Sequence, residues 1–142
     1  MKFLLDTDHI SILQKQSGPE FAKLIARIAQ VPRADLTFCI VSFHEQVIGC
    51  HTYIAQAKLP VDIIRGYGML DRVLSAFAAA VVLPFDTNAS TVFGNLRAQR
   101  VRIATMDLRI ASIALSEGLT LLTRNARDLG KVPGLAIEDW TV

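Results

Sequence analysis

Short apolar runs alternate along this chain with longer segments of helical spacing, and this alternation limits the folds open to it. Continuous apolar runs of this length are typical of strands that are buried on both faces. Strands that alternate with helices form parallel βα units, so the sequence predicts an α/β fold, a three-layer α/β/α sandwich with a central parallel sheet of four to five strands. The runs are Lys2–Leu5, Leu36–Val41, Val81–Phe85, Leu119–Thr123 and Leu135–Ile137, the last leading into Glu138-Asp139-Trp140.

The segments between these runs carry helix signals. Residues 18–30 place apolar side chains on one helical stripe, with a proline in the first turn. Residues 107–118 do the same and end at Gly118, a residue type that commonly follows a helix. Residues 62–80 also favour a helix, and Pro60 with the glycines that follow it indicates a bend between two helices that form a hairpin.

The length and composition are those of one domain. A chain of 142 residues buries roughly 68–70% of its unfolded surface, so we expect a single domain over residues 1–142. Hydrophobic residues make up 51% and the mean hydropathy is +0.37, which favours a buried sheet, a partner-covered surface, or both. The longest apolar stretch, Ala76–Phe85, falls short of the ~18 residues of a spanning helix, so no membrane insertion is expected. Asp6 interrupts the N-terminal apolar run, which argues against a signal peptide.

Two cysteines, Cys39 and Cys50, lie in apolar segments and form no CxxC pair. This usage predicts reduced thiols in or near the core of a cytoplasmic protein, with a disulfide between the two left open.

Charge is distributed unevenly along the chain. Residues 97–131 hold seven Lys or Arg and three acids, a net charge of +4, which leaves −2 for the remainder of a chain whose total is +2. A basic segment of this kind suits a phosphate-bearing partner, although for charge alone a solvated face is the better explanation.

Carboxylates and other polar side chains follow the predicted strands. In an open parallel sheet, ligands bind beyond the carboxyl ends of the strands, so these side chains share one edge. Carboxylates that gather in this way raise one another's pKa and repel, and a hard divalent cation such as Mg²⁺ or Mn²⁺ relieves the repulsion. The residues that follow strands are Asp6, Asp8, Ser42, His44, Glu45, Asp86, Thr123, Asn125 and Asp128, and Asp107 joins them from the start of a predicted helix.

Each acid also has a simpler explanation. Helix N-capping is the favoured interpretation of Asp8 and Asp86, since both precede helical segments. The helix macrodipole, worth ~0.3–1 kcal/mol, explains Asp107, and Glu45 fits an exposed helix position. Asp6 is harder to explain, because a charge directly after an apolar strand is expensive unless it is paired or bound to a metal.

Several familiar catalytic motifs are missing. The segment "HEQVIGCH" is not the HExxH of a zinc protease, no GxGxxG or GxxxxGK[ST] occurs, and Ser42 lacks a GxSxG elbow. His9 and His44 are interpreted as structural or surface residues.

Three segments resemble a known family: "FLLDTDHIS", "VSFHEQVIG" and "ATMDLRIASIALSEGLTLLTRNARDLGKVPGLAIEDW". Together they resemble PIN domains, and most closely the bacterial VapC-type toxins of toxin–antitoxin pairs. The resemblance implies a metal-dependent endoribonuclease that cleaves RNA by a metal-activated water. Matched position by position, its catalytic set is Asp6, Glu45, Asp107 and Asn125, of which the first three hold one Mg²⁺ or Mn²⁺.

The same resemblance implies supporting residues and partners. Asp8, Thr123 and Asp128 support the site, and Asp128 is placed to supply a charge because Asn125 stands where many relatives have Asp. RNA, a small antitoxin and a second copy of the chain are the implied partners. The arginines nearest the matched positions, Arg109, Arg124 and Arg127, are candidates for holding the RNA backbone.

Two alternatives stay open. A degenerate PIN module would bind RNA or a partner without cutting, and Asn125 favours it. A haloacid-dehalogenase-type phosphohydrolase also begins with a strand and D-x-D, and would use Asp6 as its nucleophile, but it leaves Glu45 and Asp107 unexplained.

Overall fold

The computed structural model describes residues 1–142, and its centre is a parallel sheet of five strands. All neighbouring strands pair in parallel, which confirms the α/β/α prediction. The order across the sheet is β3-β2-β1-β4-β5. The strands are β1 (Phe3–Leu5), β2 (Leu36–Cys39), β3 (Val82–Leu83), β4 (Thr120–Leu122) and β5 (Ile137–Glu138).

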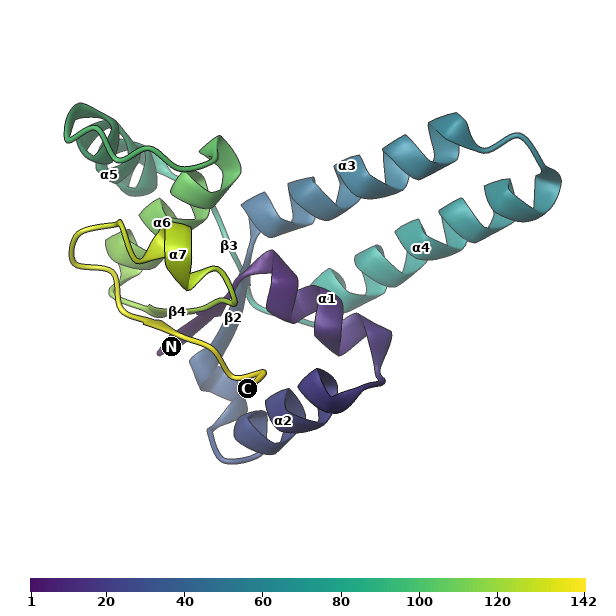
Figure 1. Ribbon diagram of the computed structural model, residues 1–142, viewed down its shortest axis with the longest axis horizontal. Helices are drawn as coiled ribbons and strands as arrows, with labels where there is room; N and C mark the ends of the chain where they lie inside the picture. Colours follow the sequence, from purple (N-terminus) through teal and green to yellow (C-terminus); the bar gives the residue numbers. More distant parts are fainter.

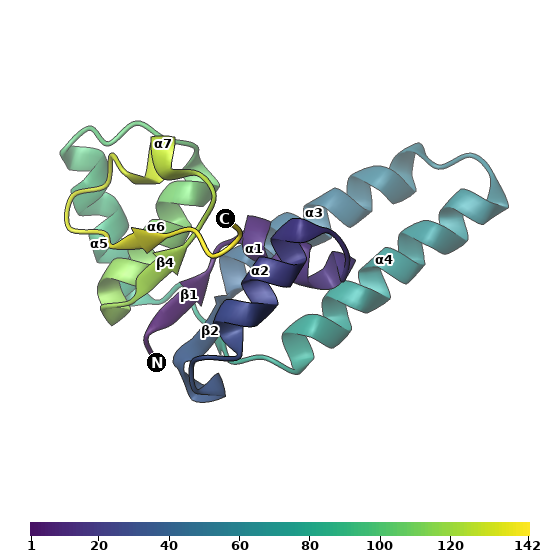
Figure 2. The same cartoon turned by 60° about the horizontal axis from the view of Figure 1, so that its bottom comes forward.

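Helices cover both faces of this sheet (Figures 1 and 2). Helices α1 and α2 lie on one side, and α5 and α6 lie on the other. Helix α2 begins at Pro19 and α6 ends before Gly118, which has the left-handed backbone (φ 68°) expected at that position. The helices are α1 (Thr7–Lys15), α2 (Pro19–Ile28), α3 (Ile40–Gln56), α4 (Pro60–Ala78), α5 (Thr87–Ala98), α6 (Thr105–Glu117) and α7 (Ala126–Leu129), with a 3-10 turn η1 (Arg33–Asp35).

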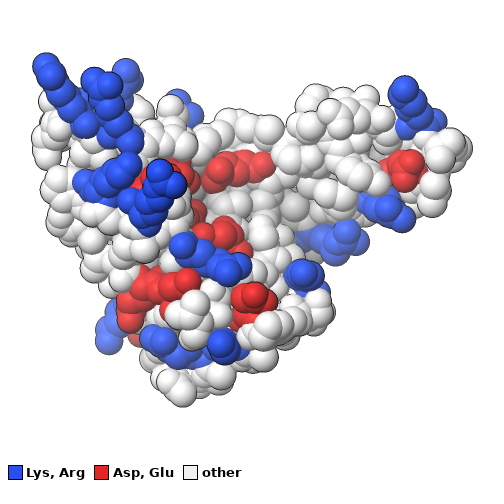
Figure 3. Space-filling model, viewed as in Figure 1, with Lys and Arg blue, Asp and Glu red and all other residues white.

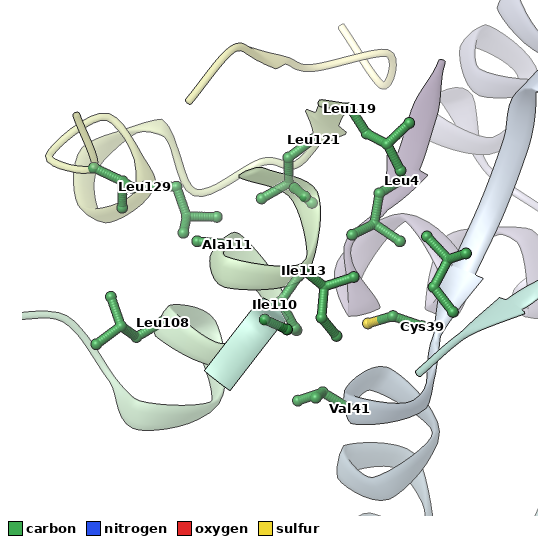
Figure 4. Close-up of a cluster of buried hydrophobic side chains, with 14 of the residues drawn as sticks. Leu4, Cys39, Val41, Leu108, Ile110, Ala111, Ile113, Leu119, Leu121 and Leu129 are labelled. Atoms are coloured by element: carbon green, nitrogen blue, oxygen red, sulfur yellow. The ribbon is translucent and has the colours of Figure 1, made fainter. Parts of the chain in front are cut away.

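Two apolar clusters, one on each face, hold the layers together. Because side chains alternate along a strand, Leu4 enters the cluster under α5 and α6, while Leu5 enters the cluster under α1 and α2. Leu121 and Leu122 divide in the same way. Figure 4 shows the first cluster, in which Leu4 and Leu121 face the buried side of α6. The apolar runs are continuous because both faces are covered.

The strands are shorter than the apolar runs that predict them. The run Leu36–Val41 stops pairing at Cys39, because α3 begins at Ile40 and turns Val41 into the core. The run Val81–Phe85 contributes only Val82–Leu83, the two residues that pair with β2 at the sheet edge. Apolar character therefore marks burial here, whereas neighbouring strands set the length of the pairing.

Helices α3 and α4 form the predicted hairpin, which projects away from the sheet (Figure 1). The chain turns between Gln56 and Pro60, and Pro60 is the first residue of α4. The helices touch at Gly66, where an added Cβ would lie 2.5 Å from Ile54 Cγ1. Glycine is therefore needed at this crossing because of close approach. None of the helices is both long and apolar enough to cross a bilayer.

Replacing Gly66 with Ala is expected to destabilise the hairpin. Alanine gains up to about 1 kcal/mol of helix propensity, but the clash with Ile54 and Tyr53 costs about 1–3 kcal/mol. We expect a lower urea midpoint at unchanged slope. The matched control is Gly49→Ala in α3, where an added Cβ meets nothing within 4 Å and the midpoint should rise. Equal shifts in the two variants would contradict this account.

Candidate active site

The candidate site lies at the carboxyl edge of the sheet, where the strand order reverses. From β1 the chain proceeds to β2 and β3 on one side, and then to β4 and β5 on the other. A crevice beyond the strand ends is expected at such a switch point. Asp6 directly follows β1 and Thr123 directly follows β4, so the two residues meet there.

Asp6 is held by donors from both sides of the switch point. Its Oδ1 accepts a hydrogen bond from the backbone N–H of Thr7 (2.8 Å), and its Oδ2 accepts one from the Thr123 hydroxyl (2.8 Å). The side chain is 5% exposed and takes part in no ion pair. Asp6 is also the N-cap of α1. One carboxylate therefore caps a helix and presents a buried acid at the strand end.

The environment of Asp6 favours its neutral form. The pKa of Asp6 is raised from 3.8 to about 7, chiefly by burial and then by the charges of Asp8 and Asp107, while the hydrogen bonds from Thr123 and Thr7 lower it. Desolvation and like charge therefore outweigh the donors. A positive ion at this position would instead favour the ionised form of Asp6 and lower its pKa.

Glu45 reaches the same edge from the second turn of α3. Its Oε1 accepts a hydrogen bond from the Thr7 hydroxyl (2.7 Å), and the Thr7 Oγ1 also lies 2.9 Å from Ser42 Oγ. Thr7 thus connects Glu45 to the residue beside Asp6. Glu45 is half-buried, so it is not the freely exposed helix residue of the simpler explanation.

Asp107 lies in the first turn of α6 and faces this group. The N-cap of α6 is Ala104, which makes no side-chain capping bond, and Asp107 forms no ion pair. Burial raises the pKa of the Asp107 carboxyl, and the charges of Glu45, Asp128 and Asp8 raise it further. A helix N-terminus alone would lower this pKa, so burial together with the surrounding acids outweighs the effect of the helix.

Asn125 and Asp128 are bound to each other. Asn125 Nδ2 donates to Asp128 Oδ2 (3.3 Å), and Asn125 Oδ1 caps α7 by accepting from the Asp128 N–H (3.4 Å). The Asn125 N–H donates to Thr123 Oγ1 (3.0 Å). Asp128 also lies 3.7 Å from Lys131 Nζ. Asn125, the last residue of the predicted catalytic set, is therefore joined to Asp128 as an amide–carboxylate pair.

Asp8 is not the N-cap that the sequence favours. Since Asp6 caps α1, Asp8 falls in the first helical turn, and its Oδ2 accepts from the Arg124 N–H (2.9 Å) and lies 3.4 Å from Thr123 Oγ1. Asp8 therefore ties α1 to the segment after β4. The same interpretation is confirmed for Asp86, which caps α5 by accepting from the Ala89 N–H (3.0 Å).

His9 is a buried structural residue behind Asp8. Its Nε2 accepts from the Trp140 N–H (3.2 Å), which leaves Nδ1 to donate to Asp8 Oδ1 (2.7 Å). The ring is fully buried. Neither the role of Thr7 nor the contacts of His9 are predicted by the sequence. Their only signal is position: each is next in the chain to an acid at the end of β1.

The donor chemistry of the edge fits Mg²⁺ or Mn²⁺, because the candidate ligands are carboxylate oxygens with unrelieved repulsion. No group of three His, Cys, Asp or Glu side chains is arranged to hold an ion directly. Mg²⁺ commonly keeps several waters and takes only one or two protein carboxylates, so direct ligation by three is not required.

Basic side chains surround the acidic edge. Figure 3 shows acidic side chains toward the middle of this face with lysine and arginine side chains around them. Arg124 and Arg127 are exposed, whereas Arg109 is half-buried in α6, two positions after Asp107.

The raised pKa of Asp6 predicts a pH-dependent effect of Asp6→Asn. The unfolded carboxyl ionises near 3.8 and the folded one near 7, so the stability that neutral Asp6 contributes is lost as pH rises through this window. Without metal, Asp6→Asn should be more stable than the wild type, by an advantage that grows about 2–3 kcal/mol from pH 5 to pH 8. Urea unfolding in EDTA measures this difference, and a pH-independent difference would disprove the assignment.

Comparison with known proteins places these features in context. A Salmonella typhimurium (strain LT2) protein named tRNA(fMet)-specific endonuclease VapC is 41% identical over 144 residues, covering 99% of this chain and 98% of that protein. A Shigella flexneri protein of the same name is 36% identical over 74 residues, covering 49% of this chain and 56% of that protein. No family model matches the chain.

Solved structures agree with this likeness. A chain of the DNA-bound VapBC structure from Salmonella typhimurium superposes with a TM-score of 0.75 at 25% identity, covering 99% of this chain and 98% of that chain. A chain of VapBC-1 from nontypeable Haemophilus influenzae gives a TM-score of 0.76 at 21% identity, covering 100% of each chain, which shows a shared fold.

Proposed function

The chain belongs to the VapC family of nuclease toxins from toxin–antitoxin systems, and from this premise we propose that it cleaves RNA at a divalent cation held by Asp6, Glu45 and Asp107. The observation that carries the proposal is the buried Asp6 carboxylate at the switch point, which has no cationic partner and a pKa raised to about 7. A structural carboxylate in that position would be expected to have a paired cation.

The residues around the edge have distinct tasks in this proposal. Thr123 and the Thr7 N–H hold Asp6 in one orientation, and the Thr7 hydroxyl holds Glu45. Asn125 and Asp128, linked to each other, orient the attacking water beside Asp107. When bound, Mg²⁺ or Mn²⁺ lowers the pKa of a coordinated water and offsets charge on the phosphate oxygens.

RNA is the proposed substrate, and initiator tRNA is the first RNA to test. The Salmonella typhimurium relative, similar over nearly the whole chain, is named for that tRNA. Arg109, Arg124 and Arg127 are proposed to hold the backbone. Both thiols are free, which fits action in the reducing cytoplasm where such RNA occurs.

A small antitoxin is the proposed protein partner, because the structural relatives are toxin–antitoxin complexes. An apolar groove of 680 Å³ bounded by α2, β2 and the end of α4 supports it, since 12 of its 13 lining residues are hydrophobic. A homodimer is also proposed. Ile64, Tyr67 and Leu74 lie at helical spacing on α4 and are 73%, 56% and 60% exposed, which suits burial against a second copy.

Metal binding is tested by thermal stability rather than by activity. Adding Mn²⁺ at slightly alkaline pH should raise the Tm of the wild type, by the equivalent of about 2.7 kcal/mol at a concentration 100 times Kd. Asp6→Asn and Asp107→Asn should lose the shift, whereas Asp71→Asn, an exposed acid of α4, should keep it. A wild type that gains nothing from Mn²⁺ or Mg²⁺ would refute the metal site.

Cleavage is tested on transcribed initiator tRNA with elongator tRNA for comparison. In Mg²⁺ we expect the wild type to cut, and Asp6→Ala or Asp107→Ala to cut at least about 100-fold more slowly while remaining folded. EDTA should stop the reaction. Mn²⁺ binding without any RNA cleavage would favour the non-cutting module. A phosphorylated Asp6 would favour the phosphohydrolase.

A further inference from the structure

A second cavity adjoins the acidic edge between α5 and α6. It has a volume of 650 Å³, and its lining includes Phe93, Arg97, Arg102, Arg109 and Asp128. Asp128 is therefore shared, since it lies in this wall and also within range of the Asp107 charge.

The charge of this cavity is positive and uncompensated. Three arginines line it against one carboxylate, and none of the three arginines takes part in an ion pair. The carboxylate, Asp128, is itself 3.7 Å from Lys131. The like charges of neighbouring arginines repel one another, and a bound anion would relieve this repulsion. Three guanidinium groups favour a phosphate, which they bind through paired N–H donors.

Phe93 lies within cation–π range of two of these guanidinium groups. The Cζ of Arg97 lies 5.6 Å from the ring centroid, and the Cζ of Arg109 lies 5.9 Å from it. Arg109 Nη1 also donates to Met106 Sδ at 3.7 Å. Such cation–π contacts reduce the side-chain freedom that arginine loses on binding a ligand. The pocket is therefore partly organised before an anion arrives.

We propose that this pocket, formed by Arg97, Arg102 and Arg109 around Phe93, binds the backbone phosphate of an RNA nucleotide next to the bond that is cut. The inference rests on the proposed RNA cleavage and adds a binding site to it. Asp128 links the two places, because it lines the pocket and lies close enough to Asp107 for its charge to act there. An RNA strand that crosses Asp107 then places a neighbouring phosphate among the arginines, whose contacts carry no base preference.

The test measures binding of a short fluorescein-labelled single-stranded RNA by anisotropy in EDTA, which keeps the RNA intact. Arg97→Gln with Arg109→Gln should weaken binding at least about tenfold and reduce the salt slope by about 0.7, the value for one single-strand phosphate contact. Phe93→Leu keeps every charge, so it should weaken binding by a smaller factor with the slope unchanged. If the double variant fails to fold, Arg97→Gln alone, at an exposed position, replaces it.

The control is Arg65→Gln, which removes an exposed arginine from α4. Unchanged affinity and slope in the pocket variants, or an equal loss in the control, would overturn the proposal. So would variants that bind RNA normally but lose a cognate antitoxin, since the pocket would then serve carboxylates of that protein. A wild type that cuts tRNA while its pocket variants bind normally refutes the pocket alone. A wild type that neither binds nor cuts RNA refutes the proposed function and the pocket together.

Discussion

The hydrogen bond from Thr123 to the buried carboxylate of Asp6 is the contact on which the candidate site depends. It joins the ends of β1 and β4 at the place where the strand order reverses, and it holds a charge that burial makes unfavourable. The neighbouring acids are positioned relative to this pair. Thr7 connects it to Glu45, and Asp8 binds the segment after Thr123. The repulsion in this group lowers the stability of the fold, and such unfavourable groupings of charge are common at functional sites.

Much of the fold could be predicted because burial on both faces leaves a direct mark on the sequence. Leu4 and Leu5 are apolar in succession since each serves a different core. The limits of the elements could not be predicted in this way. Ile40 and Val41 continue an apolar run yet begin α3, because an apolar residue at the start of a buried helix looks the same as one at the end of a strand. The strand order depends on contacts between distant segments and leaves no local signal.

The candidate site was predictable as a set of residue types rather than as a geometry. Strand ends identify Asp6 and Glu45, because the carboxyl edge of a parallel sheet is where ligands bind, whereas Asp107 is identified by its place at the start of a helix. The sequence favours Asp8 as the N-cap of α1, but the cap is Asp6. Either carboxylate is an acceptable cap, and the residue at which the backbone becomes helical decides between them. The tasks of Thr7 and His9 depend on side chains from α3 and from the segment at Trp140, far away in the chain.

The distance in sequence between Asp6 and Thr123 has a consequence for biosynthesis. The two are separated by 117 positions. Asp6 is therefore synthesised early, but the hydrogen bond that holds its carboxylate cannot form until Thr123 has been synthesised near the end of the chain. A partly translated chain carries Asp6 and Glu45 but neither Asp107 nor Thr123. The candidate site is therefore incomplete until translation has passed these positions, although β1 is among the first segments to be made.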